Sequence, residues 1–234
     1  MPGLAGGSKS PGVLFVVATP IGNLADITLR ALDVLRTVDT IVCEDSRQTL
    51  KLLNKYGIKK RLLSYFQPRE AQRIPEILRI LEEGRDAALV TDSGTPGISD
   101  PGFRLVREAI AAGIRIVPVP GPSALAAALS GSGLPTHRTL FLGFPPPKKE
   151  AARKFLRSVK DEPGTLIFYL PSRKIADFLA LALEALGNRR IVVAREMTKI
   201  HEEFIRGTIQ EIILSLEGRT MKGEMTVLIH GAGK

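Results

Sequence analysis

Tryptophan is absent from this chain of 234 residues, and Cys43 is its only cysteine. A single cysteine excludes an intrachain disulfide and a metal site built from several thiolates. No apolar run is long enough to span a bilayer, and residues 1 to 11 lack the apolar segment of a signal peptide. We therefore expect a cytoplasmic protein without a membrane partner, in which residues 1 to 11 form a disordered tail.

Several common catalytic and nucleotide-binding motifs are also absent. The sequence has no G-x-x-x-x-G-K-[ST] loop, no G-x-G-x-x-G after its first apolar run and no G-x-S-x-G elbow. His137, His201 and His230 stand far apart without the spacing of metal ligands, so we predict no metal site. What remains is a site without a metal or a covalent nucleophile, which fits group transfer from a bound donor.

Acidic residues are fewer than basic ones, 24 against 33, so the chain carries a formal net charge of +9. This excess favours an anionic partner, of which nucleic acid is the commonest. Two windows are rich in basic residues and poor in acids: residues 47–61 and residues 148–160. Either window alone is equally well explained as a solvated helix face, but two of them in a short chain favour a phosphate-binding surface.

The hydrophobic pattern alternates between short β-branched runs and helical periodicity, which predicts an α/β fold. Regular strand–helix units fill residues 12–132, which we expect to form an N-terminal α/β domain with a parallel sheet. The segment 133–138 breaks the pattern and is the expected linker. Residues 139–234 have a more mixed order, which predicts a C-terminal α/β domain with some antiparallel pairing.

Polar residues mark the expected helix starts. Asp26 is the expected cap of the first helix, and Asp45 or Ser46 that of the second. Asp100 followed by Pro101 has the order of an N-cap and a first-turn proline. Ser172 is the expected cap of the helix that follows residue 171.

Two segments rich in glycine and proline, residues 91–102 and 118–123, each follow a predicted strand and open a helix. Joints of this kind are common in α/β proteins for structural reasons alone. Two of them close together, with more glycine and proline than a joint needs, favour a ligand site. At the carboxyl ends of neighbouring parallel strands they would form the crevice in which open α/β sheets bind ligands.

Six segments together resemble the tetrapyrrole methylase family of S-adenosylmethionine-dependent methyltransferases. They are Val17–Ala31, Cys43–Leu53, Thr91–Gly102, Pro118–Leu125, Arg195–Glu203 and Lys222–Val227. The resemblance extends over residues 13 to 231. Where the porphyrinoid-modifying branches have Gly-x-Gly-x-Gly and Gly-Asp-Pro, this chain has Ala18–Gly22 and Gly94-Thr95-Pro96, which resembles the branch that acts on ribosomal RNA.

The resemblance implies two α/β domains of the tetrapyrrole methylase type, an interdomain cleft that holds S-adenosylmethionine, and a homodimer. It also implies 2′-O-methylation of the ribose of a cytidine in 16S ribosomal RNA, either as free RNA or within the assembled 30S particle. Carried over by position, the residues expected at the donor are Ile21, Gly94, Thr95, Ile98, Ser123, Ala124, Tyr169, Leu170, Met197, Met225 and Thr226.

A ribose hydroxyl is a weak nucleophile, so a general base is expected near the acceptor. Glu44, Asp45 and Asp100 are the candidates, and helix capping explains Asp45 and Asp100 equally well. The residues expected to contact RNA are Arg47, Lys51, Lys148, Lys149, Arg153, Lys154, Arg195 and Lys199. For Arg47 an ion pair with Asp45 is the competing interpretation.

Two other functions remain open from the sequence. A small-molecule methyltransferase of the tetrapyrrole type is one, although the basic charge counts against a porphyrinoid substrate. A non-enzymatic RNA-binding protein is the other. Such a protein would keep the basic windows but would have no need of the tight glycine-proline loops.

Overall fold

The computed structural model describes residues 10–66 and 70–233. The chain divides into two compact units, Met1–Ser123 and Ala124–Lys234, and each is an α/β structure as predicted. The expected N-terminal tail lies outside the described residues except for Ser10 and Pro11. Among the described helices, none combines the length and the apolar character that a membrane crossing requires.

The first unit contains a five-stranded parallel sheet in the order β3-β2-β4-β1-β5. Its strands are β1 (Val13–Val17), β2 (Thr40–Cys43), β3 (Arg61–Ser64), β4 (Ala87–Val90) and β5 (Arg115–Val119). β1 lies between β4 and β5, which confirms that the first apolar run is an interior strand. Because all strands run in the same direction, the loops that follow them emerge at one edge of the sheet.

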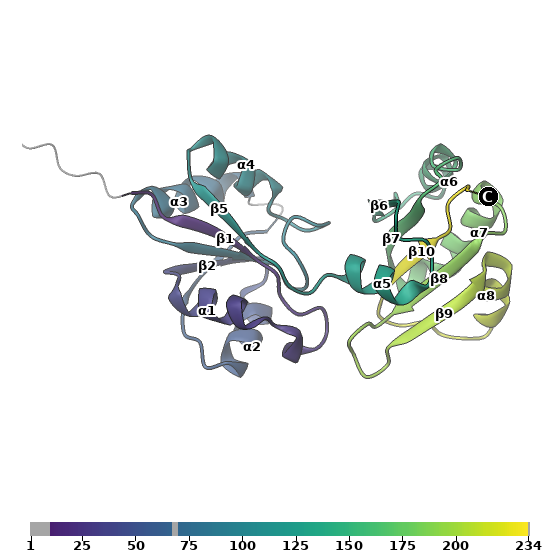
Figure 1. Ribbon diagram of the computed structural model, residues 1–234, viewed down its shortest axis with the longest axis horizontal. Helices are drawn as coiled ribbons and strands as arrows, with labels where there is room; N and C mark the ends of the chain where they lie inside the picture. The colour runs from purple at the N-terminus through teal and green to yellow at the C-terminus, as the bar shows by residue number, and fades with distance from the viewer. Residues whose placement is uncertain (1–9, 67–69, 234) are drawn as a thin grey trace, which may run out of the picture. The chain divides into compact units, whose positions relative to one another are not determined.

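Helices cover both faces of this sheet. They are α1 (Leu29–Thr37), α2 (Ser46–Lys55), α3 (Glu70–Glu82) and α4 (Phe103–Ala111). Figure 1 shows α1 and α2 on one face and α3 and α4 on the other. The alternation of side chains along β2 fits this arrangement: Ile41 and Cys43 pack with α1 and α2, while Val42 packs with α3 and α4. Cys43 is fully buried.

The second unit contains a mixed sheet in the order β6-β7-β10-β8-β9. Its strands are β6 (Thr139–Gly143), β7 (Thr165–Pro171), β8 (Arg190–Arg195), β9 (Glu203–Thr208) and β10 (Glu224–Ile229). β6 and β7 are parallel, whereas β10 runs antiparallel to β7 and β8, and β9 antiparallel to β8. The predicted antiparallel pairing in the second half of the chain is therefore confirmed.

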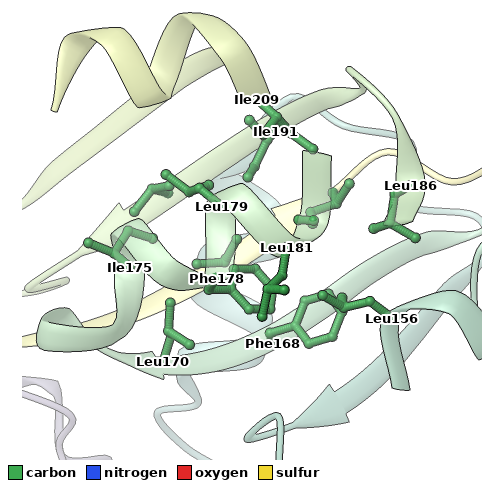
Figure 2. Packing of buried hydrophobic residues seen from close by; sticks show 14 of the residues in the cluster. Leu156, Phe168, Leu170, Ile175, Phe178, Leu179, Leu181, Leu186, Ile191 and Ile209 are labelled. Atoms are coloured by element: carbon green, nitrogen blue, oxygen red, sulfur yellow. The ribbon is translucent and has the colours of Figure 1, made fainter. Parts of the chain in front are cut away.

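The helices of the second unit are α5 (Ala124–Ser132), α6 (Lys149–Ser158), α7 (Ile175–Leu186) and α8 (Ile209–Ser215). One face of the sheet packs against α6, α7 and α8 around Phe168 and Phe178, whose ring centroids lie 5.1 Å apart. Figure 2 shows this cluster, with Leu170 and Ile175 at one end and Leu186 at the other. A short 3-10 turn, η3 (Ser172–Lys174), leads into α7.

Helix α5 belongs to the second unit, so the units divide before the segment 133–138 that the sequence favoured as a linker. α5 contacts β8, β9 and β10. Its Gly131 lies so close to the ring of Phe204 that an added Cβ would stand 2.8 Å from the Cζ atom. The helix is rich in alanine, and its small side chains permit this close approach to the sheet.

Three of the four expected helix caps are wrong. Thr28, not Asp26, caps α1, since its hydroxyl accepts a hydrogen bond from the backbone nitrogen of Ala31 at 3.1 Å. The N-cap of α4 is Gly102, two residues after Asp100. Its φ of 142° is a backbone angle that glycine adopts readily and that aspartate would adopt only with strain.

At α7 the 3-10 turn lies between Ser172 and the helix, so Lys174 takes the N-cap position without a side-chain hydrogen bond. The fourth expectation offered two residues, and of these Asp45 caps α2.

Candidate functional site

The loops that follow β1 and β4 are joined by a short antiparallel bridge between Thr19 and Gly94. The Thr19 nitrogen donates to the Gly94 carbonyl at 2.8 Å, and the Gly94 nitrogen donates back at 3.0 Å. The Thr19 hydroxyl also donates to the carbonyl oxygen of Thr91 at 3.1 Å. These bonds satisfy buried polar groups of both loops and fix them against each other at the carboxyl edge of the sheet.

The loop after β5 is attached to the same pair. The Thr95 hydroxyl donates to the carbonyl oxygen of Pro122 at 3.2 Å. A Cβ at Gly121 would stand 3.1 Å from the Cβ of Ala18, so the backbones of the first and third loops approach closely. The glycine-proline segments singled out in the sequence therefore form one connected set of loops, which we call the loop edge (residues 18–23, 91–102 and 120–123).

Ile21 and Gly94, two of the expected donor contacts, lie next to each other in the loop edge. Gly94 has φ +83°, and a Cβ placed there would stand 3.5 Å from the Cγ2 atom of Ile21. Ile98 is 37% exposed, and Ser123 lies at the end of the third loop. Apolar side chains beside bare backbone fit the adenosine and carboxylate parts of an S-adenosylmethionine-like ligand.

Four further donor residues lie on adjacent strands of the second unit, where Met225 pairs with Leu170 and Thr226 with Tyr169. Leu170 and Met225 point into the core cluster under α7. Since side chains alternate along a strand, Tyr169 and Thr226 face the opposite side of the sheet. The structure thus brings these four residues together as two pairs, Leu170 with Met225 on one face of the sheet and Tyr169 with Thr226 on the other. Ala124, the first residue of α5, belongs to this unit too.

Met197 lies in a strained turn after β8. Its neighbours Glu196 and Thr198 both have positive φ, 48° and 66°. The Glu196 carboxylate accepts from Lys199 Nζ at 2.9 Å and from the Glu224 nitrogen at 3.1 Å. Partial burial acts to raise the pKa of Glu196, but these hydrogen bonds outweigh it and hold the pKa below its ordinary value. The turn is therefore rigidly held, and it buries Met197 to 7% exposure.

Glu44 is the strongest general-base candidate by geometry and charge. It directly follows β2, next to the end of β4, where burial and the nearby carboxylate of Asp92 raise its pKa above the ordinary 4.5. Burial and Asp45 likewise raise the pKa of Asp92, although a hydrogen bond from the Asp45 backbone opposes this. Perturbed carboxylates at a strand edge are typical of functional sites. Asp92 was not among the residues predicted for the site, although its position directly after a predicted strand was a usable signal.

The Asp45 carboxylate caps α2 and pairs with Arg47. Its carboxylate accepts from the Arg47 backbone nitrogen at 2.8 Å and from the Arg47 guanidinium at 2.6 Å. These contacts lower the pKa of Asp45 to about 2, which makes it a weak base at neutral pH. The ion pair that competed with an RNA-binding role for Arg47 is therefore present, with 85% of the Arg47 side chain exposed. Asp100 lies in the loop edge and is partly buried.

The expected RNA-binding residues differ in how far they are already paired. Arg153 contacts both Glu150 and Glu184, and only 22% of its side chain is exposed. Arg195 pairs with Glu203 at 3.3 Å, and Lys199 with Glu196. In contrast, Lys148, Lys149 and Lys154 are exposed and make no ion pair with any residue that the structure describes. Lys51, also exposed, donates to the side chain of Gln48 at 2.9 Å.

Potential metal ligands do not gather anywhere in the described part of the chain: residues 10–66 and 70–233 contain no group of three His, Cys, Asp or Glu side chains that could hold an ion.

The chain thus consists of two α/β units, the first with joined glycine-proline loops at the carboxyl edge of a parallel sheet. Residues 13–213 match the model of the tetrapyrrole (corrin/porphyrin) methylases, and the chain belongs to that family.

Two bacterial relatives match over almost the whole chain. A protein of Thermotoga maritima is 47% identical over 220 residues, which cover 94% of this chain and 99% of the relative. A protein of Xylella fastidiosa is 49% identical over 227 residues, which cover 96% of this chain and 83% of the relative. Both carry the name ribosomal RNA small subunit methyltransferase I.

Solved structures agree on the fold. The crystal structure of a cobalt precorrin-4 methyltransferase superposes with a TM-score of 0.68, covering 93% of this chain and 94% of that one. At 18% sequence identity this likeness concerns the fold alone.

Proposed function

We propose that this protein is an S-adenosylmethionine-dependent methyltransferase that modifies small-subunit ribosomal RNA at the 2′-hydroxyl of a cytidine ribose. The observation that carries the proposal is the loop edge, in which the Thr19–Gly94 bridge and the Thr95–Pro122 bond unite three loops. The names of the relatives at 47% and 49% identity supply the substrate class. The net charge of +9 agrees with a polyanionic acceptor.

The donor would be held by Ile21, Gly94, Thr95, Ile98 and Ser123 in the first unit. Ile21 and Ile98 offer apolar surface for the adenine ring. Backbone groups of the loop that follows Gly94 would bind the polar parts of the donor, since the N–H and C=O of Gly94 itself are bonded to Thr19. In the second unit, Tyr169, Thr226 and the neighbouring strand ends are the proposed contacts. S-adenosylmethionine supplies an electrophilic methyl group when it is bound.

The residues of the chain then have two tasks. Glu44 accepts the proton of the ribose hydroxyl, because its raised pKa brings its basicity closer to what proton transfer near neutral pH requires. Asp92 holds the end of β2 in place through its hydrogen bond from the Asp45 nitrogen. Lys148 and Lys154 bind RNA phosphates, and we expect the protein to act as a homodimer.

The test is methyl transfer from radiolabelled S-adenosylmethionine to free 16S ribosomal RNA and to assembled 30S particles. Methylation of a 2′-hydroxyl removes the nucleophile of alkaline RNA cleavage, so the modified position should appear as a gap in an alkaline hydrolysis ladder. Label on a base without such a gap would contradict the ribose assignment. Label on a tetrapyrrole and none on either form of RNA would contradict the substrate class.

A further inference from the structure

A pocket formed by residues 144–181 lies wholly within the second unit and shares no residue with the loop edge. It has a volume of about 190 Å³ and is bordered by the turn before α6, the end of β7, η3 and the first turns of α7. Pockets that take drug-sized ligands measure roughly 300–1,000 Å³. This one therefore suits a single planar ring rather than a whole nucleotide cofactor. We call it the α6–α7 pocket.

The floor of the α6–α7 pocket is apolar and rigid. Leu170, Phe178 and Leu181 line it, and all three are buried members of the core cluster labelled in Figure 2. The wall is the segment Pro145–Pro147 together with Phe144. Because proline fixes the backbone and the floor is part of the core, little conformational entropy would be lost when a ligand enters.

Phe144 is the exposed aromatic residue among those that line the pocket. It is 58% exposed, and its ring packs edge-on against Tyr169 with centroids 5.7 Å apart. Tyr169 is held in turn by Phe141 at 5.0 Å. The edge contact fixes the orientation of the Phe144 ring while more than half of the residue stays in solvent. A fixed, exposed aromatic ring is the usual stacking platform for an unpaired nucleobase.

Positive charge surrounds the same pocket. Lys149, Arg173 and Lys174 line it and are exposed, and none of them makes an ion pair with another residue of the described ranges 10–66 and 70–233. A single acid, Asp177, lines the pocket with them. Its carboxylate can accept hydrogen bonds from an exocyclic amine, the group that distinguishes some bases from others.

Lysines also occupy the N-terminal ends of α6 and α7, where the helix dipole makes positive charge unfavourable. The N-cap of α6 is Lys148 and that of α7 is Lys174, and neither makes a side-chain capping hydrogen bond. Polar side chains or acids normally occupy such positions, since the first turn has free N–H groups and a partial positive charge. A phosphate would satisfy the amides and the lysines together.

We propose that the α6–α7 pocket binds one unpaired nucleotide of a single-stranded RNA, with the base against Phe144 and the phosphate at the starts of α6 and α7. The inference rests on the proposed RNA substrate but concerns a different part of the chain. It gives the second unit an anchoring role, in which a nucleotide away from the methylated ribose fixes the register of the RNA.

The experiment measures the affinity of the full-length protein for a short unstructured oligoribonucleotide, and for the same strand annealed to its complement. Phe144→Ala should weaken single-strand binding by roughly tenfold or more, since the variant cannot stack a base at this position. Duplex binding should stay unchanged. Phe103→Ala is the matched control, because Phe103 is 68% exposed on α4 in the first unit. Phe144→Tyr keeps an aromatic ring and should retain the wild-type affinity.

The phosphate part is tested by the salt dependence of the same binding. Arg173→Glu should reduce the slope of log affinity against log salt, by about 0.7 for each phosphate that the variant no longer neutralises. Arg115→Glu makes the same charge change on β5, outside the pocket, and should reduce the slope less. Equal effects of Phe144→Ala and Phe103→Ala, or equal weakening of single-strand and duplex binding, would overturn the proposal.

Failure of the inference can be told apart from failure of the proposed function. If the wild-type protein methylates RNA but the Phe144 and Phe103 variants bind it alike, only the α6–α7 pocket assignment is wrong. If the wild-type protein binds neither oligoribonucleotide and labels neither 16S RNA nor 30S particles, the proposed function is wrong as well.

Discussion

Asp92 Oδ1 lies 3.0 Å from the backbone nitrogen of Asp45 and so joins the loop after β4 to the loop after β2. Glu44 stands next to this hydrogen bond, with its pKa raised by burial and by the Asp92 charge. Burial raises the pKa of both carboxyl groups, Glu44 and Asp92, and a raised carboxyl pKa destabilises the folded protein at neutral pH. The proposed role of Glu44 as general base would account for their presence at the carboxyl edge of the sheet.

Replacement of Glu44 by glutamine should slow methyl transfer by roughly 10²–10⁴-fold, the usual contribution of a general base. Single-turnover assays at saturating donor measure this step directly. The wild-type rate should rise with pH as Glu44 loses its proton, at a pH above the ordinary 4.5 of a glutamate. Glu44→Gln should lack this rise, because the variant has no proton to lose.

Asp45→Asn is the control for this assignment. The pKa of Asp45 is about 2, so its ionisation cannot produce an acid limb near neutral pH. If the asparagine variant loses as much activity as Glu44→Gln and also loses the pH-dependent rise, Glu44 is not the base.

Glu44→Gln should also change the stability of the folded protein, by an amount that depends on pH. A folded-state pKa above the unfolded value means that the unfolded chain ionises first as pH rises, so folding stability is lost across that window. Glu44→Gln should therefore raise the midpoint of thermal unfolding at about pH 7–8 and leave it unchanged below the ordinary pKa. A variant that is less stable than the wild type at neutral pH would contradict the raised pKa.

Asp45 should behave in the opposite sense. Its pKa is lowered from 3.8 to about 2, so its stabilisation is present above 3.8 and disappears as pH falls towards 2. Asp45→Asn should lower the unfolding midpoint at neutral pH and match the wild type only in strong acid. Thermal unfolding followed by circular dichroism across this range measures both effects.

Gly94→Ala should weaken S-adenosylmethionine binding more than it weakens the fold. At φ +83° a side chain costs about 1–2 kcal/mol of backbone strain. The added Cβ meets Ile21 only at ordinary van der Waals distance, so no clash adds to this cost. Isothermal calorimetry gives the donor affinity and chemical denaturation gives the stability.

Gly113→Ala provides the matched comparison, because Gly113 has φ +72°, open space around it and no place in the loop edge. Both variants should lose similar stability, and only Gly94→Ala should lose donor affinity. Equal donor affinity in the two variants would remove Gly94 from the proposed donor site.

The basic residues of α6 should separate into two classes. Lys148→Ala combined with Lys154→Ala should reduce the salt slope of single-stranded RNA binding by about 1.4. Arg153→Ala should leave that slope nearly unchanged, since Arg153 is already paired with Glu150 and Glu184. Fluorescence anisotropy at a series of salt concentrations measures both slopes. A large loss of slope in Arg153→Ala would mean that RNA displaces the glutamates.

The order and type of the strands and helices followed closely from the sequence, because burial on a parallel sheet leaves continuous apolar runs. The apolar run that begins at Val13 forms an interior strand, and the β-branched or aromatic runs Thr139–Gly143 and Arg190–Arg195 form strands as well. Helix caps were harder to predict, because the choice between Asp26 and Thr28 depends on which backbone angle the preceding turn adopts.

Pairings between distant residues could not be predicted from the sequence. Arg153 looked like a free cation in a basic window, yet its partner Glu184 lies on α7, which packs beside α6. The hydrogen bond between Asp92 and the Asp45 nitrogen depends on the pairing of β4 with β2, which the sequence did not predict. The sequence could not show that the starts of α6 and α7, which lack side-chain caps, border the same pocket, the observation on which the proposed phosphate site rests.

Cys43, the only sulfhydryl in the chain, ends β2 inside the core of the first unit. Burial raises the pKa of its thiol above the ordinary 9.0, although a hydrogen bond with Thr49 opposes the effect. Little of the reactive thiolate therefore exists at neutral pH, and maleimide reagents should leave the native residue untouched. A second cysteine placed at Ile200, which is 97% exposed, would take up a fluorophore selectively, so dyes can be attached without first removing the natural thiol.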